Sequence, residues 1–347
     1  MNAQFFRAAT AQAFLEACNL LGMKVCIPEI VIDEVFGNFK EKLAEAKTAL
    51  KKPTKLVKSL VDIEFPDIPV EDLSNQFQTW FLSLLKDNAV EILPYPDIVP
   101  KELVTKAYTK VKPFKATGGG HKDYLVWETI KANILGKQTS PPYIFVNHNT
   151  SDFAEKVEDG SIVLHSELAK QIGEAAPNLT YYTSLSTVFD DVLAPKLEHF
   201  NLSDIPTLLD EITDLTHGTL MAELDFRSVY GLEGLSFGGE VTIQHIGDHD
   251  ISDRKLYKVG DSIVVEVSGH VEVEASGYMD KSDYYIHEED NKDIYVSDGN
   301  WNDHVMTVSQ VVNTPFVITG IYSVESESFV SQSFELPSEI EDEWPYK

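Results

Sequence analysis

Three acidic residues that lie far apart in this 347-residue chain each follow a segment expected to be a strand or a tight turn. Glu34 comes shortly after "MKVCI", Asp123 follows a run of glycines, and Asp152 comes just after "YIFVN". Ligand sites in parallel α/β sheets form outside the carboxyl ends of the strands, so these acids are placed to converge. Converging carboxylates repel one another unless a cation lies between them, and hard oxygen ligands suit Mg²⁺ or Mn²⁺. The pattern therefore predicts a Mg²⁺ or Mn²⁺ site.

A metal ion at such a site lowers the pKa of a bound water and stabilises the charge that develops on a phosphate under attack. Lys115 and Lys122 are the nearest cations in the sequence, and we expect them to hold the phosphate backbone of a substrate. The glycines before His121 let the chain approach the site closely and leave the next helix free to present its N-terminus to an anion. Asp123 would then be a ligand where the helix dipole favours negative charge.

Each acid taken alone also has a simpler interpretation. Asp123 and Asp152 stand where an acid often caps a helix, and Glu34 is compatible with a solvated surface position. The glycine run lacks the GK[ST] ending of a phosphate-binding loop, so it is also compatible with a plain flexible loop. Only the combination of the three acids, in order and in context, favours a metal site.

The hydrophobic periodicity predicts the elements that would position these residues. Pro28 opens a long helix in which Val31, Val35, Phe39 and Leu43 recur at helical spacing and form the expected buried face. Further helices and short strands then alternate, including "AVEILPY", "HKDYLVWETIKANIL", "PPYIFVN" and "SIVLHSELAKQIG". This alternation predicts an α/β fold with a parallel sheet flanked by helices, extending to about Phe189.

The C-terminal part has a different period. After Phe226 apolar and polar residues alternate, as in "EVTIQHI" and "SIVVEVSGHVEVEASGYM", which predicts a small antiparallel β domain. The run "HIGDHDISD" fits no helix face and is predicted to be a solvated turn. We therefore expect a first domain over residues 1–190, a helical connector over 191–225, a β domain over 226–342 and the end of an acidic tail over 343–347.

Charge is distributed unevenly. The formal net charge is −28, which argues against a general nucleic-acid binder because phosphate contacts need Lys and Arg. From Phe226 onward there are 24 acids and 7 bases, whereas eight lysines lie between Lys101 and Lys137, where only three acids occur. We therefore expect an anionic substrate at the first domain and a possible protein partner, such as a basic protein, at the acidic β domain.

The remaining composition bears on location. Cys18 and Cys26 form neither a disulfide framework nor a zinc-binding spacing, which favours a reducing compartment. The sequence contains no run of 18 apolar residues and no N-terminal secretion signal. The expectation is a cytoplasmic protein that does not associate with a membrane.

Four strings in order, "KVCIPEIVIDEV", "PFKATGGGHKDYLVWETI", "YIFVNHNTSDFA" and "SIVLHSEL", resemble the PIN-domain nucleases, specifically the PIN-like group with a β-rich C-terminal extension. The resemblance covers roughly residues 1–190. It implies a metal-dependent endonuclease that acts mainly on RNA, with Glu34, Asp123 and Asp152 as the acidic cluster and Asn149 as a supporting polar group. Asn147 stands where the family usually has Ser or Thr.

The resemblance also implies a first central strand that ends in an acid, and this sequence does not contain one. "MNAQFF" has no acid, and the first acidic residue is Glu16. We expect that the chain is truncated or that Met1 is an internal methionine.

The sequence is compatible with two functions. One is a metal-dependent endoribonuclease that hydrolyses phosphodiester bonds in single-stranded or structured RNA. The other is a catalytically impaired PIN-like scaffold that acts as a protein- or RNA-binding module.

Overall fold

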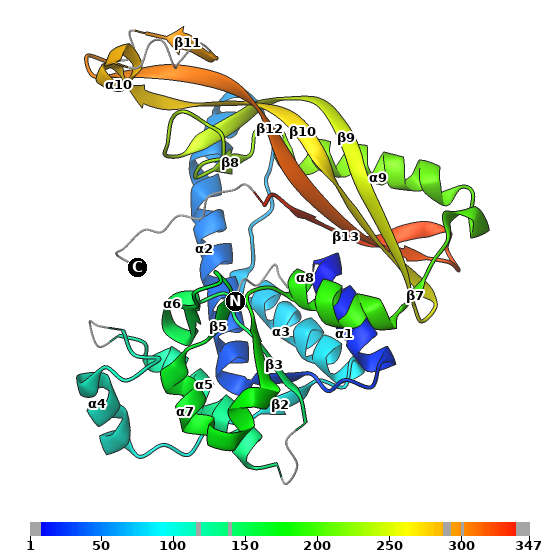
Figure 1. Ribbon diagram of the computed structural model, residues 1–347. Helices are drawn as coiled ribbons and strands as arrows, with labels where there is room; N and C mark the ends of the chain where they lie inside the picture. Colours follow the sequence, from blue (N-terminus) through cyan, green and yellow to red (C-terminus); the bar gives the residue numbers. More distant parts are fainter. Residues whose placement is uncertain (1–7, 116–118, 138–140, 287–292, 300–301, 338–347) are drawn as a thin grey trace. The chain divides into compact units, whose positions relative to one another are not determined.

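The computed structural model describes residues 8–115, 119–137, 141–286, 293–299 and 302–337 (Figure 1). The chain divides into two compact units, the first comprising Ala11–Lys196 and the second comprising Ala8–Thr10 with the residues from Leu197 onward. The first unit has small parallel sheets with helices, and the second has a separate antiparallel sheet, which confirms the predicted fold class. The predicted domain boundaries stay predictions, and the tail at 343–347 lies outside the described residues.

The first unit alternates helices with short strands. In chain order its elements are α1 (Ala9–Leu20, which begins in the second unit), β1 (Cys26–Pro28), α2 (Glu29–Leu60), α3 (Val70–Asp87), β2 (Glu91–Leu93), α4 (Pro100–Thr109), α5 (His121–Leu135), β3 (Tyr143–Val146), α6 (Thr150–Phe153), β4 (Ala154–Lys156), β5 (Ile162–Leu164), α7 (Ser166–Ile172), β6 (Leu179–Tyr182) and α8 (Leu185–Val188). Three short non-α helical turns follow α7 and α8: η2 (Gly173–Asn178), η3 (Phe189–Leu193) and η4 (Ala194–Lys196).

The parallel pairing of the first unit is split. β1 pairs with β2 and β3 pairs with β6, both in parallel, while β4 and β5 form an antiparallel pair. Over the described residues the expected single parallel sheet is therefore two small parallel sheets. The expected lack of a first strand stays a prediction, because residues 1–7 lie outside the described residues.

The start of α2 lies between two hydrophobic cores. Ile30 belongs to a core with Trp127 and Phe145, whereas Ile32 and Val35 belong to a second core that includes the aromatic side chains of α3. Side chains on two sides of these turns are buried in the cores, and this burial fixes the start of the helix firmly. Each buried aliphatic or aromatic side chain contributes about 1.5–3 kcal/mol to the stability of the folded state. The beginning of α2 is thus a rigid support for any side chain that it carries.

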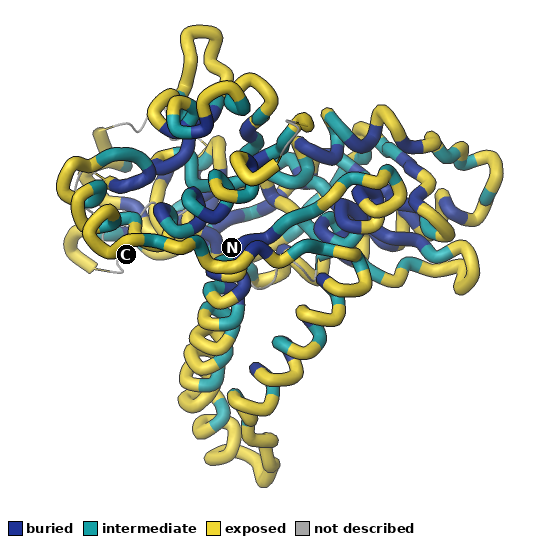
Figure 2. The backbone as a smooth tube through the Cα atoms, turned by 90° about the horizontal axis from the view of Figure 1, so that it is seen from below, coloured by how far each residue is buried: buried dark blue, intermediate teal, exposed yellow. Residues whose placement is uncertain are grey.

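The rest of α2 is polar and exposed. Of the predicted buried face, Val35 is buried, and Val31 and Phe39 pack partly buried against a core. Leu43 is only half-buried because the helix extends past the core. Figure 2 shows a long helix of this unit with outer turns that are mostly yellow, which means exposed.

The second unit is built on a twisted antiparallel sheet. Its elements are β7 (Glu198–His199), η5 (Leu202–Asp204), α9 (Leu208–Leu224), β8 (Ser228–Val229), β9 (Val241–Val259), β10 (Ser262–Asp280), α10 (Lys281–Ile286), β11 (Ile294–Asp298), β12 (Val305–Ser323) and β13 (Ser328–Glu335). The strand order is β11-β12-β10-β9-β7, with β13 added to β12 and β8 added to β9. Alternate residues of β10 are buried, and α9 packs its apolar side chains into the same core.

Two local predictions for this part need correction. "HIGDHDISD" is not a turn but the middle of β9, which pairs with β10 through several register shifts. The bulges interrupt the two-residue period, and the outward positions of a strand accept polar residues, so the pattern resembled a loop. The segment 191–225 is helical only in part, because it contains β7.

None of the helices within the described ranges combines the length and apolar character needed to cross a bilayer. The cytoplasmic location stays a prediction.

The core under α2 and α3 gives a stability prediction. Phe81 is fully buried, and its ring lies 5.7 Å from that of Phe36 and 5.9 Å from that of Phe77. Phe81→Ala removes these contacts and leaves a cavity, so we expect the free energy of unfolding to fall by about 3–5 kcal/mol. Urea denaturation followed by far-UV circular dichroism measures it. Leu82→Ala on the same helix is the control, since Leu82 is 44% exposed and should change stability by about 0.5 kcal/mol or less.

A partly buried ion cluster gives a pH prediction. Glu128 on α5 forms salt bridges with Lys106, at 3.0 Å, and with Lys131. Burial alone would raise the pKa of Glu128, but the hydrogen bonds from Lys131 and Lys106 outweigh it and lower the pKa. A lowered pKa in the folded state contributes stability that is present above the unfolded pKa of about 4.3 and is lost as the pH falls through the folded value.

We therefore expect Glu128→Gln to destabilise the protein most at neutral pH and progressively less as the pH falls below about 4. Denaturant unfolding across this pH range measures the effect. Glu45→Gln, at an exposed position of α2, should show no such trend. A destabilisation by Glu128→Gln that is the same at every pH would contradict the assignment.

Candidate functional site: a bridged pair of aspartates

Each predicted acid is held by a well-packed element. Glu34 lies in the second turn of α2, directly before the fully buried Val35. Asp123 lies in the first turn of α5. Asp152 lies in α6, next to the fully buried Phe153, and its own side chain is only 1% exposed. The core residues beside these acids fix where the carboxylates can lie.

The turn before α5 depends on glycine. Gly120 has φ of +108°, and a Cβ at this position would lie 3.0 Å from the carbonyl oxygen of Pro113. Only glycine adopts this conformation without strain. The loop folds back on itself here, because the Lys115 N–H donates to the carbonyl of Gly119 at 2.9 Å. This places Lys115 beside the start of α5. Gly118 lies outside the described residues.

Asn149 connects two of the acids. Its side-chain Nδ2 donates to Oδ1 of Asp123 at 3.3 Å and to Oδ2 of Asp152 at 2.8 Å. Its Oδ1 accepts a hydrogen bond from the Ser151 hydroxyl at 2.8 Å, and its backbone N–H donates to Oδ1 of Asn147 at 2.7 Å. These bonds fix the amide so that both N–H groups face the carboxylates. The supporting polar residue implied by the resemblance therefore lies between Asp123 and Asp152.

The charges of the two aspartates repel each other, and neighbouring groups oppose this repulsion. Burial and the neighbouring charge of Asp152 raise the pKa of Asp123, with a smaller contribution from Glu34 in the same direction. The hydrogen bond from Asn149 and the charge of Lys115 oppose this shift. Lys115 Nζ lies 3.6 Å from Oδ2 of Asp152. Two neighbouring like charges, one of them almost fully buried, with one nearby ammonium favour binding of a further cation.

Glu34 lies outside this pair. Its Oε1 is 3.4 Å from Nζ of Lys122, and its side chain is 30% exposed. Within the described residues no three His, Cys, Asp or Glu side chains are close enough together to hold a metal ion. The structure thus brings Asp123 and Asp152 together through Asn149, whereas Glu34 influences Asp123 through its charge and forms a salt bridge with Lys122. Both predicted lysines contact a predicted acid.

Sequence reasoning missed three supporting residues. Lys112 donates from Nζ to the backbone carbonyl of Ser151 at 2.6 Å, which ties the loop before α5 to α6. The hydroxyl of Tyr181 on β6 donates to the carbonyl of Asn147 and holds the end of β3. The lysine-rich composition pointed to the region of Lys112, but nothing in the sequence singled out this lysine, Ser151 or Tyr181.

The Asn149 bridge gives a test of the geometry. Asn149→Ala removes the only amide that donates to both aspartates among the described residues, and it leaves the buried Asp152 carboxylate with one fewer donor. Loss of a hydrogen bond to a buried polar group costs about 1–3 kcal/mol, so we expect the free energy of unfolding to fall by this amount. Asn75→Ala, at an exposed position of α3, is the control. Equal effects of both variants in urea denaturation would contradict the bridge.

One of three comparisons with known proteins finds a match. Residues 2–153, which contain all three acids and Asn149, match a family model described as a PIN domain. Searches of curated proteins and of solved structures find no match to the chain. PIN domains are generally nucleases that depend on divalent metal ions.

Proposed function

We propose that this chain, in which residues 2–153 belong to the PIN-domain family, is a divalent-metal-dependent endoribonuclease that hydrolyses phosphodiester bonds. The observation that carries the proposal is the pair of carboxylates, Asp123 and Asp152, joined by the Asn149 amide at the start of a helix. A surface cap or a solvated acid needs no such shared donor, whereas a catalytic carboxylate pair needs its members oriented. The family match supports the same class of activity.

The residues present fit a divalent cation. Asp152 is almost fully buried, and burial together with the charge of Asp152 raises the pKa of Asp123, so bringing both carboxylates close together is unfavourable without a cation. Oxygen ligands of this kind suit Mg²⁺ or Mn²⁺. Asp123 and Asp152 would hold the ion, with Glu34 as a further carboxylate nearby. Once bound, a divalent metal activates a water and neutralises charge on the phosphate.

The protein's own side chains would bind and orient the RNA. Lys115 lies beside Asp152, and Lys122 is 70% exposed in the first turn of α5. Both ammonium groups can contact phosphate oxygens on either side of the bond that is cut, and such contacts are independent of base identity. Asn149 acts as a positioning residue, because its amide fixes the direction of both aspartate side chains.

Cleavage of a mixed pool of single-stranded RNA in Mn²⁺ tests the proposal. We expect Asp123→Asn and Asp152→Asn each to lower the cleavage rate about 100-fold or more, which corresponds to roughly 3 kcal/mol of lost transition-state stabilisation. Asp62→Asn is the matched control, because Asp62 is exposed and distant in sequence from the site. Cleavage that persists unchanged in both site variants would overturn the proposal.

A second readout separates the enzyme from its alternative, a PIN-like scaffold that binds RNA or protein without cutting. A ligand that binds only the folded state raises the melting temperature. We expect Mn²⁺ to raise the melting temperature of the wild-type protein and of Asp62→Asn, but not of Asp123→Asn or Asp152→Asn. An Mn²⁺ response without any RNA cleavage would favour the scaffold.

A further inference from the structure

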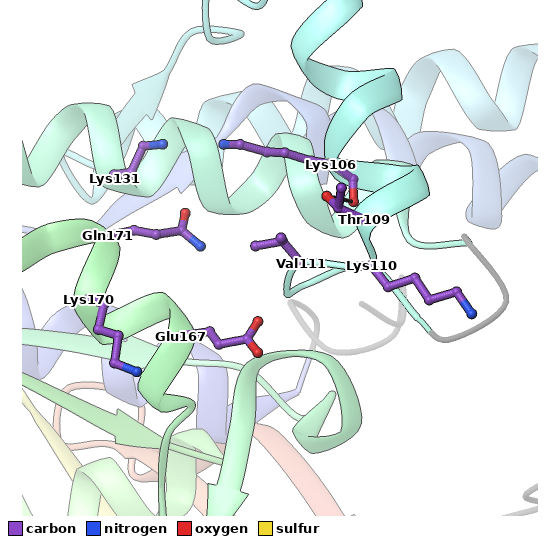
Figure 3. Close-up of a pocket in the computed structure, with 8 residues that line it drawn as sticks. All are labelled: Lys106, Thr109, Lys110, Val111, Lys131, Glu167, Lys170 and Gln171. Atoms are coloured by element: carbon purple, nitrogen blue, oxygen red, sulfur yellow. Dashed lines mark hydrogen bonds between the residues drawn. The ribbon is translucent and has the colours of Figure 1, made fainter.

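The first unit contains an open pocket that is separate from the aspartate pair. Its volume is about 510 Å³, within the range of pockets that take small ligands. Its lining residues, drawn as sticks in Figure 3, come from the end of α4 and the two residues after it, from the C-terminal half of α5 and from α7. The residues that line it are Lys106, Thr109, Lys110, Val111, Lys131, Glu167, Lys170 and Gln171. Four of these eight residues are lysines, in a protein with a formal net charge of −28.

The lysines are of two kinds. Lys106 and Lys131 share the carboxylate of Glu128, which keeps both ammonium groups on the same side of α5, and Figure 3 shows their ends pointing toward each other. In the described part of the chain, Lys110 and Lys170 form no ion pair with an acid. One partly buried carboxylate thus anchors two cations, while the ends of Lys110 and Lys170 point outward in Figure 3 and remain available to a ligand at the rim.

The neutral groups of the pocket are already engaged. Gln171 accepts from the indole N–H of Trp127 at 2.9 Å, and the Thr109 hydroxyl donates to the carbonyl of Thr105, also at 2.9 Å. None of the described residues that line the pocket is aromatic, so they offer no surface on which a base could stack. Charge is therefore the main property that the pocket presents, and it fits a phosphate group better than a nucleobase.

A short segment connects the pocket to the aspartate pair. The Lys112 backbone N–H donates to Oε2 of Glu167, at the pocket wall, at 3.1 Å. The side chain of the same lysine donates to the carbonyl of Ser151, the residue before Asp152. Lys110 lines the pocket and Lys115 contacts Asp152, so cations follow the chain from one place to the other.

We propose that this lysine pocket binds a backbone phosphate of the single-stranded RNA at a nucleotide away from the bond that is cut. This inference rests on the proposed function, because it assigns a second contact to the same substrate. The pocket anchors the strand through charge alone, so it recognises single-stranded RNA independently of sequence. Contacts at two separate places on one strand also favour a longer RNA over a dinucleotide.

Binding in EDTA tests this inference without cleavage. The probe is a fluorescein-labelled oligouridylate, and its anisotropy is measured over a range of salt concentrations. For single strands, log affinity falls with log salt by about 0.7 for each neutralised phosphate. Because the pocket takes one phosphate, we expect Lys110→Gln/Lys170→Gln to reduce this slope by about 0.7 and to weaken binding at low salt about tenfold. The control, Lys55→Gln/Lys58→Gln, removes two exposed lysines from the outer part of α2 and should change neither value.

Further arms distinguish the alternatives. The variant Lys110→Arg/Lys170→Arg retains the charge and should bind as the wild type does, with circular dichroism showing that all variants are folded. Equal loss of affinity in the Lys55/Lys58 control would overturn the pocket assignment. Displacement of the probe by inorganic phosphate, at the same concentration of phosphate groups as in the RNA, would also overturn the assignment, because it would indicate a site for the free anion. Displacement by polyglutamate would overturn it too, because it would indicate a site for an acidic protein segment.

The two proposals can fail separately. If RNA cleavage proves independent of Asp123 and Asp152, only the proposed mechanism is lost, and the binding measurement in EDTA still decides the role of the pocket. If the Lys110/Lys170 variant binds the probe like the wild type while Asp152→Asn abolishes cleavage, only the pocket assignment is lost.

Discussion

The candidate site depends on one electrostatic constraint: two aspartates, one of them almost completely buried, lie close together in the same unit. Like charges in a medium of low dielectric constant destabilise each other, and here burial together with the charge of Asp152 raises the pKa of Asp123. The arrangement persists because one amide, that of Asn149, donates to both carboxylates and because an ammonium group, that of Lys115, lies beside Asp152. Such partial compensation leaves a negative site suited to a further cation.

The surrounding structure holds these groups in place. Gly120 allows the sharp turn that places Asp123 and Lys115 together, and the short bonds among Asn147, Asn149 and Ser151 fix the amide. Behind them, the buried Phe153 and the cores on two sides of α2 prevent the elements from shifting. A constellation held by packed elements and secondary hydrogen bonds keeps its geometry better than one that is built on free loops.

Charge is distributed differently in the two units. Four lysines of the first unit line the pocket and Lys115 lies beside Asp152, although the chain as a whole is strongly acidic. A local excess of cations can attract an anionic substrate, while the surrounding negative charge disfavours nonspecific contact with nucleic acid elsewhere. The second unit contains the acid-rich C-terminal part of the chain and has its own hydrophobic core, formed by its antiparallel sheet and α9.

The sequence predicted the class of fold because periodicity reports which face of each element is buried. It placed the helix "HKDYLVWETIKANIL" at the residues observed, with Asp123 in its first turn. Its failures came where local pattern and tertiary context disagree. The polar run in β9 resembled a turn because bulges interrupt the alternation of apolar and polar residues along the strand. The parallel strands form two small sheets because tertiary packing, and not the local sequence, decides which strands pair.

For the candidate site, the sequence by itself determined which residue types were available: three acids, one asparagine and two lysines, each beside a strand or a helix start. Only the tertiary structure decided their grouping. It placed Asn149 between Asp123 and Asp152, left Glu34 with Lys122, and recruited Lys112, which no pattern had distinguished. The physical reason is that hydrogen bonds and ion pairs act over a few ångströms, and such distances between residues far apart in the chain are set by how the cores pack.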